Sequence, residues 1–186
     1  YGAGRMKALR RSIYVSAVLI GTVTIVLNIA ALSFIHPILK LLQIPDDIYQ
    51  MMYDYLWIIF WGIGFTFIYN FYAALLRAIG NAVTPLYFLA ISVVLNIGLD
   101  LFFILLLDWG IKGAAIATII AQGVSALGIM GYTYAKCPEL RLHRNDLHFD
   151  RHCLKEITSF STLTCIQQSV MNLGILMVQG LSLIHI

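Results

Sequence analysis

Long apolar runs separated by short polar stretches set the pattern of this 186-residue chain. Each run exceeds the roughly 20 residues with which a helix, rising about 1.5 Å per residue, crosses the hydrocarbon core of a bilayer. The pattern therefore predicts five membrane-spanning helices, over residues 12–39, 48–77, 85–107, 111–134 and 157–180. The long polar stretch, residues 135–156, is predicted to be a loop or a surface helix between the last two spans.

The composition agrees with a membrane protein. The chain is 60% hydrophobic and 11% charged, whereas a soluble domain is about 45–50% apolar and about 25% charged. Its three cysteines, Cys137, Cys153 and Cys165, have neither the number nor the spacing of a disulfide framework. The sequence contains no phosphate-binding glycine loop, nucleophile elbow or paired catalytic carboxylates. We expect a protein surrounded by lipid that is not an enzyme and has no nucleic acid partner and no cofactor.

The basic residues predict how the spans are oriented. Ten of the twelve fall on one side of the membrane if the five spans alternate: four before the first span, Arg77 after the second, and five within residues 135–156. Lys40 and Lys112 fall on the other side. Cytoplasmic segments carry the excess of Lys and Arg. We therefore expect a multi-pass protein of the plasma (cytoplasmic) membrane with residues 135–156 in the cytoplasm.

An acidic residue, Asp100, lies inside the third predicted span, one helical turn after Asn96. A carboxylate at the centre of a bilayer costs about 3 kcal/mol or more, so such residues usually face a cavity or a partner and mark an ion or substrate path. Residues i and i+4 project from the same face of a helix. This face is interpreted as the working face of a transporter; the alternative is an Asp bonded to a neighbouring helix for packing alone.

The third and fourth predicted spans form a hairpin that turns near Trp109. Asp100 precedes Trp109 by nine residues and Thr118 follows it by nine, which predicts that they lie at nearly equal depth. Asn96, Asp100 and Thr118 would then meet in one oxygen-rich pocket. Such oxygens suit a hard cation such as Na⁺, and a carboxylate can also carry H⁺. Alternatively, the Thr118 hydroxyl bonds the backbone of its own helix.

Two further patterns are ambiguous between packing and function. Small residues recur every four positions in the fourth span, at Gly113, Ala117, Ala121 and Ser125, which favours close helix packing in lipid. Polar amides within spans either join helices by hydrogen bonds or line a substrate cavity. The residues for which a cavity role is considered are Gln122, Gln168, Asn172 and Asn70.

The polar stretch contains residue types that can bind a metal ion. His143, His148, His152 and Cys153 contain metal-binding side chains, but their spacing matches no recognised zinc pattern. A solvated cytoplasmic loop explains them, so no metal site is expected other than Na⁺ at Asn96, Asp100 and Thr118.

Three segments carry a family resemblance: LRAIGNAVTPLYFL (residues 76–89), LNIGLDLFF (95–103) and GAAIATIIAQ (113–122). With the opening YGAGRMKALRRS and the late LTCIQQSVMNLGILMVQG, they resemble the multidrug and toxic compound extrusion (MATE) transporters. The resemblance implies an all-α, polytopic membrane bundle of twelve helices in two six-helix lobes. This chain would cover the family's third to seventh spans, most of the N-terminal lobe.

The resemblance also implies a function. The family exports organic cations and other toxic compounds in exchange for H⁺ or Na⁺, so small organic, cationic substrates are expected. Its N-lobe cation site uses an Asn and an Asp one turn apart and a Thr in the next helix, roles that Asn96, Asp100 and Thr118 match. A further acidic residue from the family's first helix, which this chain lacks, normally completes that site.

The expected organisation follows from the resemblance. Residues 1–134 would form four spans of the N-terminal lobe, 135–156 an inter-lobe loop and 157–180 the first span of the C-terminal lobe. Residues 181–186, LSLIHI, back-translate to a sequencing adapter and are expected to be an artefact. This chain is expected to be a fragment, and the missing helices of the same full-length chain would be its partners.

Two other functions are alternatives to a cation-coupled exporter. A lipid-linked oligosaccharide flippase of the same superfamily should show a basic central cavity, and almost no Lys or Arg lies inside a predicted span. A non-transporting membrane subunit would have no need of Asn96, Asp100 and Thr118 at one depth.

Overall fold

A computed structural model describes residues 6–41, 44–140 and 151–184, and these residues are almost entirely helical. The α-helices are α1 (Met6–Ser33), α2 (Ile35–Leu41), α3 (Asp46–Trp61), α4 (Ile63–Ala78), α5 (Val83–Leu101), α6 (Gly110–Lys136) and α7 (Arg151–Ile184). A π-helix, η1 (Phe102–Leu106), extends α5, and a 3₁₀ turn, η2 (Pro138–Leu140), follows α6. The predicted all-α bundle is confirmed.

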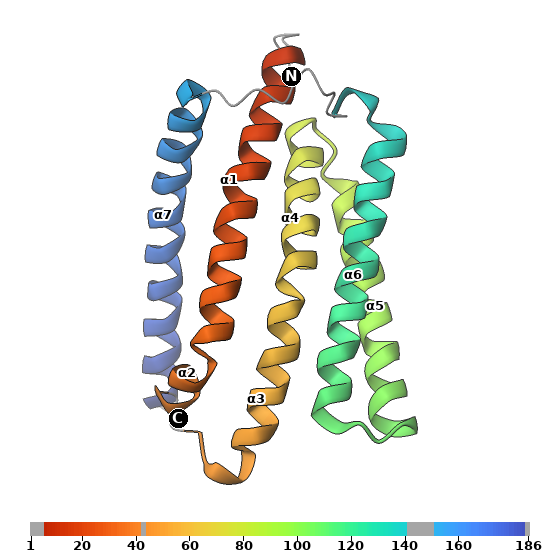
Figure 1. Cartoon of the computed structure of the whole chain (residues 1–186), viewed down its shortest axis with the longest axis vertical. Coiled ribbons are helices and arrows are strands. Elements are labelled where there is room, and N and C mark those ends of the chain that lie inside the picture. The colour runs from red at the N-terminus through yellow and green to blue at the C-terminus, as the bar shows by residue number, and fades with distance from the viewer. Residues whose placement is uncertain (1–5, 42–43, 141–150, 185–186) are drawn as a thin grey trace.

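The long helices stand side by side (Figure 1). α3 and α4 follow one another as a single column, α5 and α6 form a hairpin, and α7 lies beside α1 at the opposite edge. α6 packs against α3, α4 and α5, while α1 packs against α3 and α4. Since α6 packs against α3, α4, α5, η1 and η2, the candidate site is built around it.

Four helical segments are long and apolar enough to cross a membrane: Ala8–Ser33, Asp46–Ala78, Val83–Leu106 and Gly110–Lys136. They correspond to the first four predicted spans, and the protein is a multi-pass membrane protein. The fifth predicted span, residues 157–180, lies within α7. Polar residues such as Gln167, Gln168 and Asn172 interrupt its apolar character, so its crossing of the membrane stays a prediction.

The structure describes both flanks of the polar stretch, residues 135–156, which was predicted to be a loop or a surface helix. α6 continues to Lys136 and α7 begins at Arg151, so both flanks belong to helices, while residues 141–150 lie outside the described part of the chain. Residues 181–184 continue α7.

Three of the spans depart from a straight α-helix. The first is interrupted at Phe34, between α1 and α2, and the second at Gly62, between α3 and α4. The third ends in the π-helix η1, after which Asp108 (φ 52°) and Gly110 (φ 54°) take left-handed conformations. Glycine adopts such a φ without steric cost, which allows the chain to turn directly into α6.

The ladder of small residues on α6 has the packing role that was predicted. All four of its residues are buried. A Cβ atom on Gly113 would lie 2.9 Å from Cβ of Phe103, and the hydroxyl of Ser125 donates to the Phe88 carbonyl at 2.9 Å. The ladder therefore brings the backbones of α5 and α6 close together, as small residues do between membrane helices.

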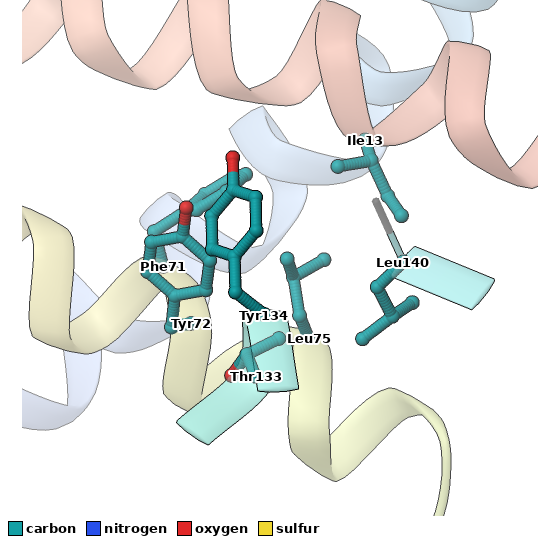
Figure 2. Close-up of a pocket in the computed structure, with 7 residues that line it drawn as sticks. All are labelled: Ile13, Phe71, Tyr72, Leu75, Thr133, Tyr134 and Leu140. Carbon is teal, nitrogen blue, oxygen red and sulfur yellow. The ribbon is translucent and has the colours of Figure 1, made fainter. Parts of the chain in front are cut away.

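A small apolar core closes one end of the bundle. Ala73, Leu76 and Ile129 are fully buried where α4 meets α6. Beside this core, α1, α4, α6 and η2 enclose a hollow of about 20 Å³ (Figure 2). Its lining residues are Ile13, Phe71, Tyr72, Leu75, Thr133, Tyr134 and Leu140. A space of that size holds about one water molecule, so it is not a substrate site.

Most of the described basic residues lie on helix ends that gather at one end of the bundle. These are the start of α1, the end of α4, the end of α6 and the start of α7, which lie together at the top of Figure 1. The ends that carry Lys40 and Lys112, in α2 and at the start of α6, lie at the bottom. The structure thus has the alternating arrangement from which the orientation was predicted.

Candidate cation and substrate site

Asn96 and Thr118 are in direct contact across the α5–α6 hairpin. The Asn96 side-chain amide donates to the Thr118 hydroxyl at 3.3 Å, and that hydroxyl donates to the Ala114 carbonyl of its own helix at 3.0 Å. Both side chains are half-buried. Thr118 therefore bonds its own backbone and also accepts the Asn96 amide, while its part in an oxygen-rich ion pocket stays a prediction.

Asp100 is also half-buried, one turn along α5 from Asn96. Among the described residues, its Oδ1 is the buried side-chain oxygen that has no hydrogen-bond partner. Buried polar atoms in folded proteins are nearly always partnered by protein or by water, and lipid supplies neither. An unpartnered carboxylate oxygen here is suited to receive a cation or a proton.

The hairpin register differs from the one counted from the sequence. Thr118 bonds Asn96 and not Asp100, which lies about 6 Å further toward the α5–α6 turn, four residues along the helix. The π-helix η1 separates Asp100 from that turn. A count of residues from the turn assumes one helix type throughout, so it does not fix the depth of Asp100 beyond a π-helix, which bonds i→i+5.

The oxygen atoms of this group fit a hard cation. The Asn96 amide donates through Nδ2, so its Oδ1 remains available as an acceptor, an orientation assigned from the hydrogen bonds. A carboxylate, an amide oxygen and a hydroxyl are oxygen ligands of the kind that hard cations prefer. Within the described residues no three or more His, Cys, Asp and Glu side chains are grouped to hold a metal ion. His143 and His148 lie outside the described residues, and the side chains of His152 and Cys153 are not described.

A second group of predicted residues lines a cavity of about 260 Å³ between α4, α5 and α6. Asn70 and Gln122 both lie on its wall. The Thr66 hydroxyl donates to Oε1 of Gln122 at 3.0 Å, and the Asn70 amide donates to the Thr66 carbonyl at 2.8 Å. The complete lining is Thr66, Tyr69, Asn70, Leu89, Ser92, Gln122 and Ser125. It carries polar and aromatic groups without a charged side chain, as small-molecule sites often do.

Gln168 and Asn172 are not part of this cavity. Both are exposed on α7 and are bonded to each other, the Gln168 amide donating to Oδ1 of Asn172 at 3.5 Å. α7 packs beside α1, away from the α4–α6 cavity. The structure therefore brings together two of the four amide residues considered for a cavity.

Asn28 and Thr66 make contacts that were not predicted from the sequence. The Asn28 amide, on α1, donates to the Phe60 carbonyl of α3, and Thr66 holds Gln122 in place. An Asn within an apolar span was a signal that could have identified Asn28, as it did Asn96. An ion pair between Asp54 of α3 and Lys112 of α6, with N–O 2.8 Å, joins residues too distant in sequence for their pairing to be predicted.

Comparison with known proteins identifies the family. The family model described as MatE matches residues 1–102. The chain is similar to the probable multidrug resistance protein YpnP of Bacillus subtilis, with 38% identity over 126 residues, which are 68% of this chain and 28% of that protein. It is also similar to the probable multidrug resistance protein NorM of Thermotoga maritima, with 30% identity over 189 residues, 98% of this chain and 40% of that protein.

A solved structure shares the fold. It is an inward-facing conformation of a multidrug resistance MATE family transporter of the MOP superfamily. The TM-score is 0.78 at 24% identity, covering 84% of this chain and 36% of that one.

This chain belongs to the MATE family, as its sequence motifs indicated. It spans 28% to 40% of the length of these curated relatives.

Proposed function

We propose that this chain is part of a cation-coupled antiporter that exports drugs or other toxic organic compounds by alternating access. The observation that carries the proposal is the buried, unpartnered carboxylate oxygen of Asp100 beside the bonded pair Asn96 and Thr118. Names of the relatives as probable multidrug resistance proteins support it.

In this proposal Asn96, Asp100 and Thr118 bind the coupling ion, which is Na⁺ or H⁺. Asp100 supplies the negative charge, while the amide oxygen of Asn96 and the Thr118 hydroxyl supply neutral ligands. Because the ion binds only one of the conformations well, its binding shifts the population between conformations by the difference in affinity. A gradient of that ion can then drive the alternation.

The cavity on α4, α5 and α6 is the proposed place of the substrate. Gln122 lies one turn beyond Thr118 on the same face of α6, so the cavity and the ion site adjoin. The uncharged lining, which includes the aromatic residue Tyr69, suits small organic compounds, cationic ones among them, because aromatic rings bind cations. Gln168 and Asn172 would contribute only if α7 faced a shared central cavity.

The arrangement of charge supports an orientation for the proposed transporter. Residues 135–156 lie in the cytoplasm and the α5–α6 turn lies outside, with the protein in the plasma membrane. Residues 1–134 form four spans of one lobe, residues 157–180 begin the other, and the remaining spans come from parts of such a transporter that this chain does not cover.

The test is ion-driven transport by the complete transporter that contains this chain. The protein is reconstituted into proteoliposomes, and uptake of a fluorescent organic cation is measured with a Na⁺ gradient, a pH gradient, both, or neither. Uptake above the no-gradient level with one of the two ions supports the proposal and identifies the ion. Uptake equal under all four conditions would contradict it.

A further inference from the structure

The span Asp46–Ala78 is broken in its middle, and a side chain from another helix bonds the backbone at the break. α3 ends at Trp61 and α4 begins at Ile63. Between them the N–H of Gly62 donates to the Ile59 carbonyl at 2.8 Å, so the i→i−4 bonding of the helix tightens locally to i→i−3. The Asn28 amide of α1 donates to the neighbouring Phe60 carbonyl. Lipid offers no partner to the backbone of a broken helix, so a protein donor such as Asn28 stabilises the break.

Gly62 is needed at the break for space. Its φ of −72° is one that any residue adopts. A Cβ atom at Gly62, however, would lie 3.0 Å from Cγ1 of Ile119 and 3.4 Å from Oε1 of Gln122. At Gly64, two residues further on, a Cβ atom would meet nothing within 4 Å. α6 therefore packs close against the break, whereas a side chain at Gly64 would have open space.

The two ends of the span are held by an ion pair and by apolar packing, and its middle by the hydrogen bonds at Phe60 and Thr66. The Asp54–Lys112 ion pair ties α3 to α6, and the buried residues Ala73 and Leu76 pack the far half of α4. Between these anchors, Thr66 and Asn70 line two hollows, one of about 260 Å³ toward α5 and α6 and one of about 350 Å³ toward α1. Residues 62–70 thus have room to rearrange without displacing the ends.

Two hydrogen bonds and one helical turn of α6 separate this segment from the candidate ion site. Thr66, one turn after Gly62, donates to Gln122. Gln122 lies one turn from Thr118 on the same face of α6, and Thr118 receives Asn96. A change in the break alters the position of Thr66 and hence of Gln122, next to the residues proposed to bind the ion.

We propose that Asn28 is a positioning residue for ion coupling, because its amide sets the break at Gly62 and the break sets how Thr66 meets Gln122. Residues 62–70 change between this broken form and a straighter one as the ion site is filled. The inference rests on the proposed function and concerns residues that do not themselves touch the ion.

The first test compares two substitutions of Asn28 in the complete transporter in proteoliposomes. Asn28→Leu keeps the approximate size and removes the donor, whereas Asn28→Gln keeps an amide donor. We expect Asn28→Leu to lower the coupling-ion concentration for half-maximal uptake on the order of fivefold, because one hydrogen bond is lost from the broken, ion-free form and the ion-bound form is favoured. Asn28→Gln should keep the ion concentration for half-maximal uptake close to that of the unsubstituted transporter. Thr22→Val is the control, because the Thr22 hydroxyl donates within α1, to the Val18 carbonyl at 2.7 Å.

The second test measures the shape of the span directly. Spin labels are placed at the exposed positions Met51 on α3 and Ala74 on α4. The distance between the two labels is measured by pulsed electron paramagnetic resonance with and without the coupling ion. We expect the distance to shift with the ion in the otherwise unsubstituted transporter and in Gly64→Ala. In Gly62→Ala, where the new methyl group meets Ile119, the distance should be the same with and without the ion.

The outcomes separate the two proposals. Uptake that follows no ion gradient would overturn both. Ion-driven uptake with the same ion dependence in Asn28→Leu as in the unsubstituted protein, or a Met51–Ala74 distance that does not respond to the ion, would overturn the positioning role alone. If Gly62→Ala does not fold, the comparison of Asn28→Leu with Asn28→Gln and the Met51–Ala74 distance in Gly64→Ala still test the positioning role.

Discussion

The side chains of Asn96 and Thr118 are joined by a 3.3 Å hydrogen bond that links α5 to α6 in the middle of the hairpin. The bond fixes which residues of the two helices face each other, and it places the carboxylate of Asp100 one turn away with a buried oxygen that the described residues leave unpartnered. In the proposed ion site, this pair supplies the neutral side and the Asp100 carboxylate supplies the charged side.

Asp100→Asn tests the charged side in the complete transporter. The amide keeps the shape of the carboxylate but neither attracts Na⁺ nor carries H⁺ in transport, so ion-driven uptake should fall at least tenfold. Thermal stability should hold or rise, because the substitution removes a half-buried charge that lacks a partner. Uptake in proteoliposomes and a melting curve are measured on the same preparation.

A structural role for Asp100 gives the opposite pairing of results. Stability would fall, and uptake would fall only in proportion to the amount of folded protein. Ion coupling at the unsubstituted level in a stable Asp100→Asn protein would exclude Asp100 from the ion site.

The position of Asp100 shows what the sequence could and could not predict. Apolar runs of adequate length predicted four of the spans, because length and composition alone decide whether a helix can cross lipid. The sequence placed Asp100 and Thr118 at nearly equal depth, whereas the side chain that bonds Thr118 is Asn96, one turn before Asp100, and the π-helix Phe102–Leu106 lies between Asp100 and the hairpin turn. A local change of helix type leaves no periodicity that a residue count detects.

Thr118→Val tests the neutral side. Valine has nearly the same shape, but it cannot accept the Asn96 amide, so one inter-helix hydrogen bond is lost. Such bonds in membrane proteins average about 0.6 kcal/mol, so the melting temperature should fall only slightly. The ion concentration for half-maximal uptake should rise severalfold, less than the loss expected for Asp100→Asn, since one neutral ligand of several is removed.

Thr162→Val is the matched control for Thr118→Val. The Thr162 hydroxyl bonds the Thr158 carbonyl within α7 at 2.8 Å, as Thr118 bonds Ala114, but it lies away from the hairpin. An equal change in ion dependence in both variants would show that the Thr118–Asn96 contact has no part in coupling.

Contacts between helices distant in sequence account for the rest of what sequence reasoning missed. Gln122 and Asn70 were considered for a cavity because amides are rare in apolar spans, and the structure places both on one wall. Thr66, which connects them, has a residue type common in membrane helices and gave no signal. Gln168 and Asn172 had the same signal as Gln122, yet they lie on α7. The polar pattern identifies candidate residues, and only the packing of α4 on α6 determines which of them meet.

Gly113→Ala tests the close approach of α5 and α6. The added methyl group would lie 2.9 Å from Cβ of Phe103 and 3.0 Å from Cβ of Trp109, so these residues have to move. Such overpacking costs about 1–3 kcal/mol, and the melting temperature of the complete transporter should fall accordingly. At Gly131 a Cβ atom meets nothing within 4 Å, and alanine there should be neutral or stabilising by up to about 1 kcal/mol. Equal melting temperatures for the two variants would contradict the close packing.

The orientation of the hairpin is tested with single cysteines in a cysteine-free version of the complete transporter. Ala82 lies in the turn between α4 and α5, at the end of the bundle where the basic helix ends gather, and Trp109 lies in the turn between α5 and α6 at the other end. The excess of Lys and Arg marks the cytoplasmic side. Ala82→Cys should therefore resist a membrane-impermeant thiol reagent in intact cells and react in opened ones, whereas Trp109→Cys should react in both. Both positions are exposed, so a lack of reaction at Ala82→Cys in intact cells would reflect the membrane barrier and not burial. Labelling of Ala82→Cys from outside, with Trp109→Cys protected, would contradict this orientation. The α5–α6 turn, toward which Asp100 lies, would then face the cytoplasm.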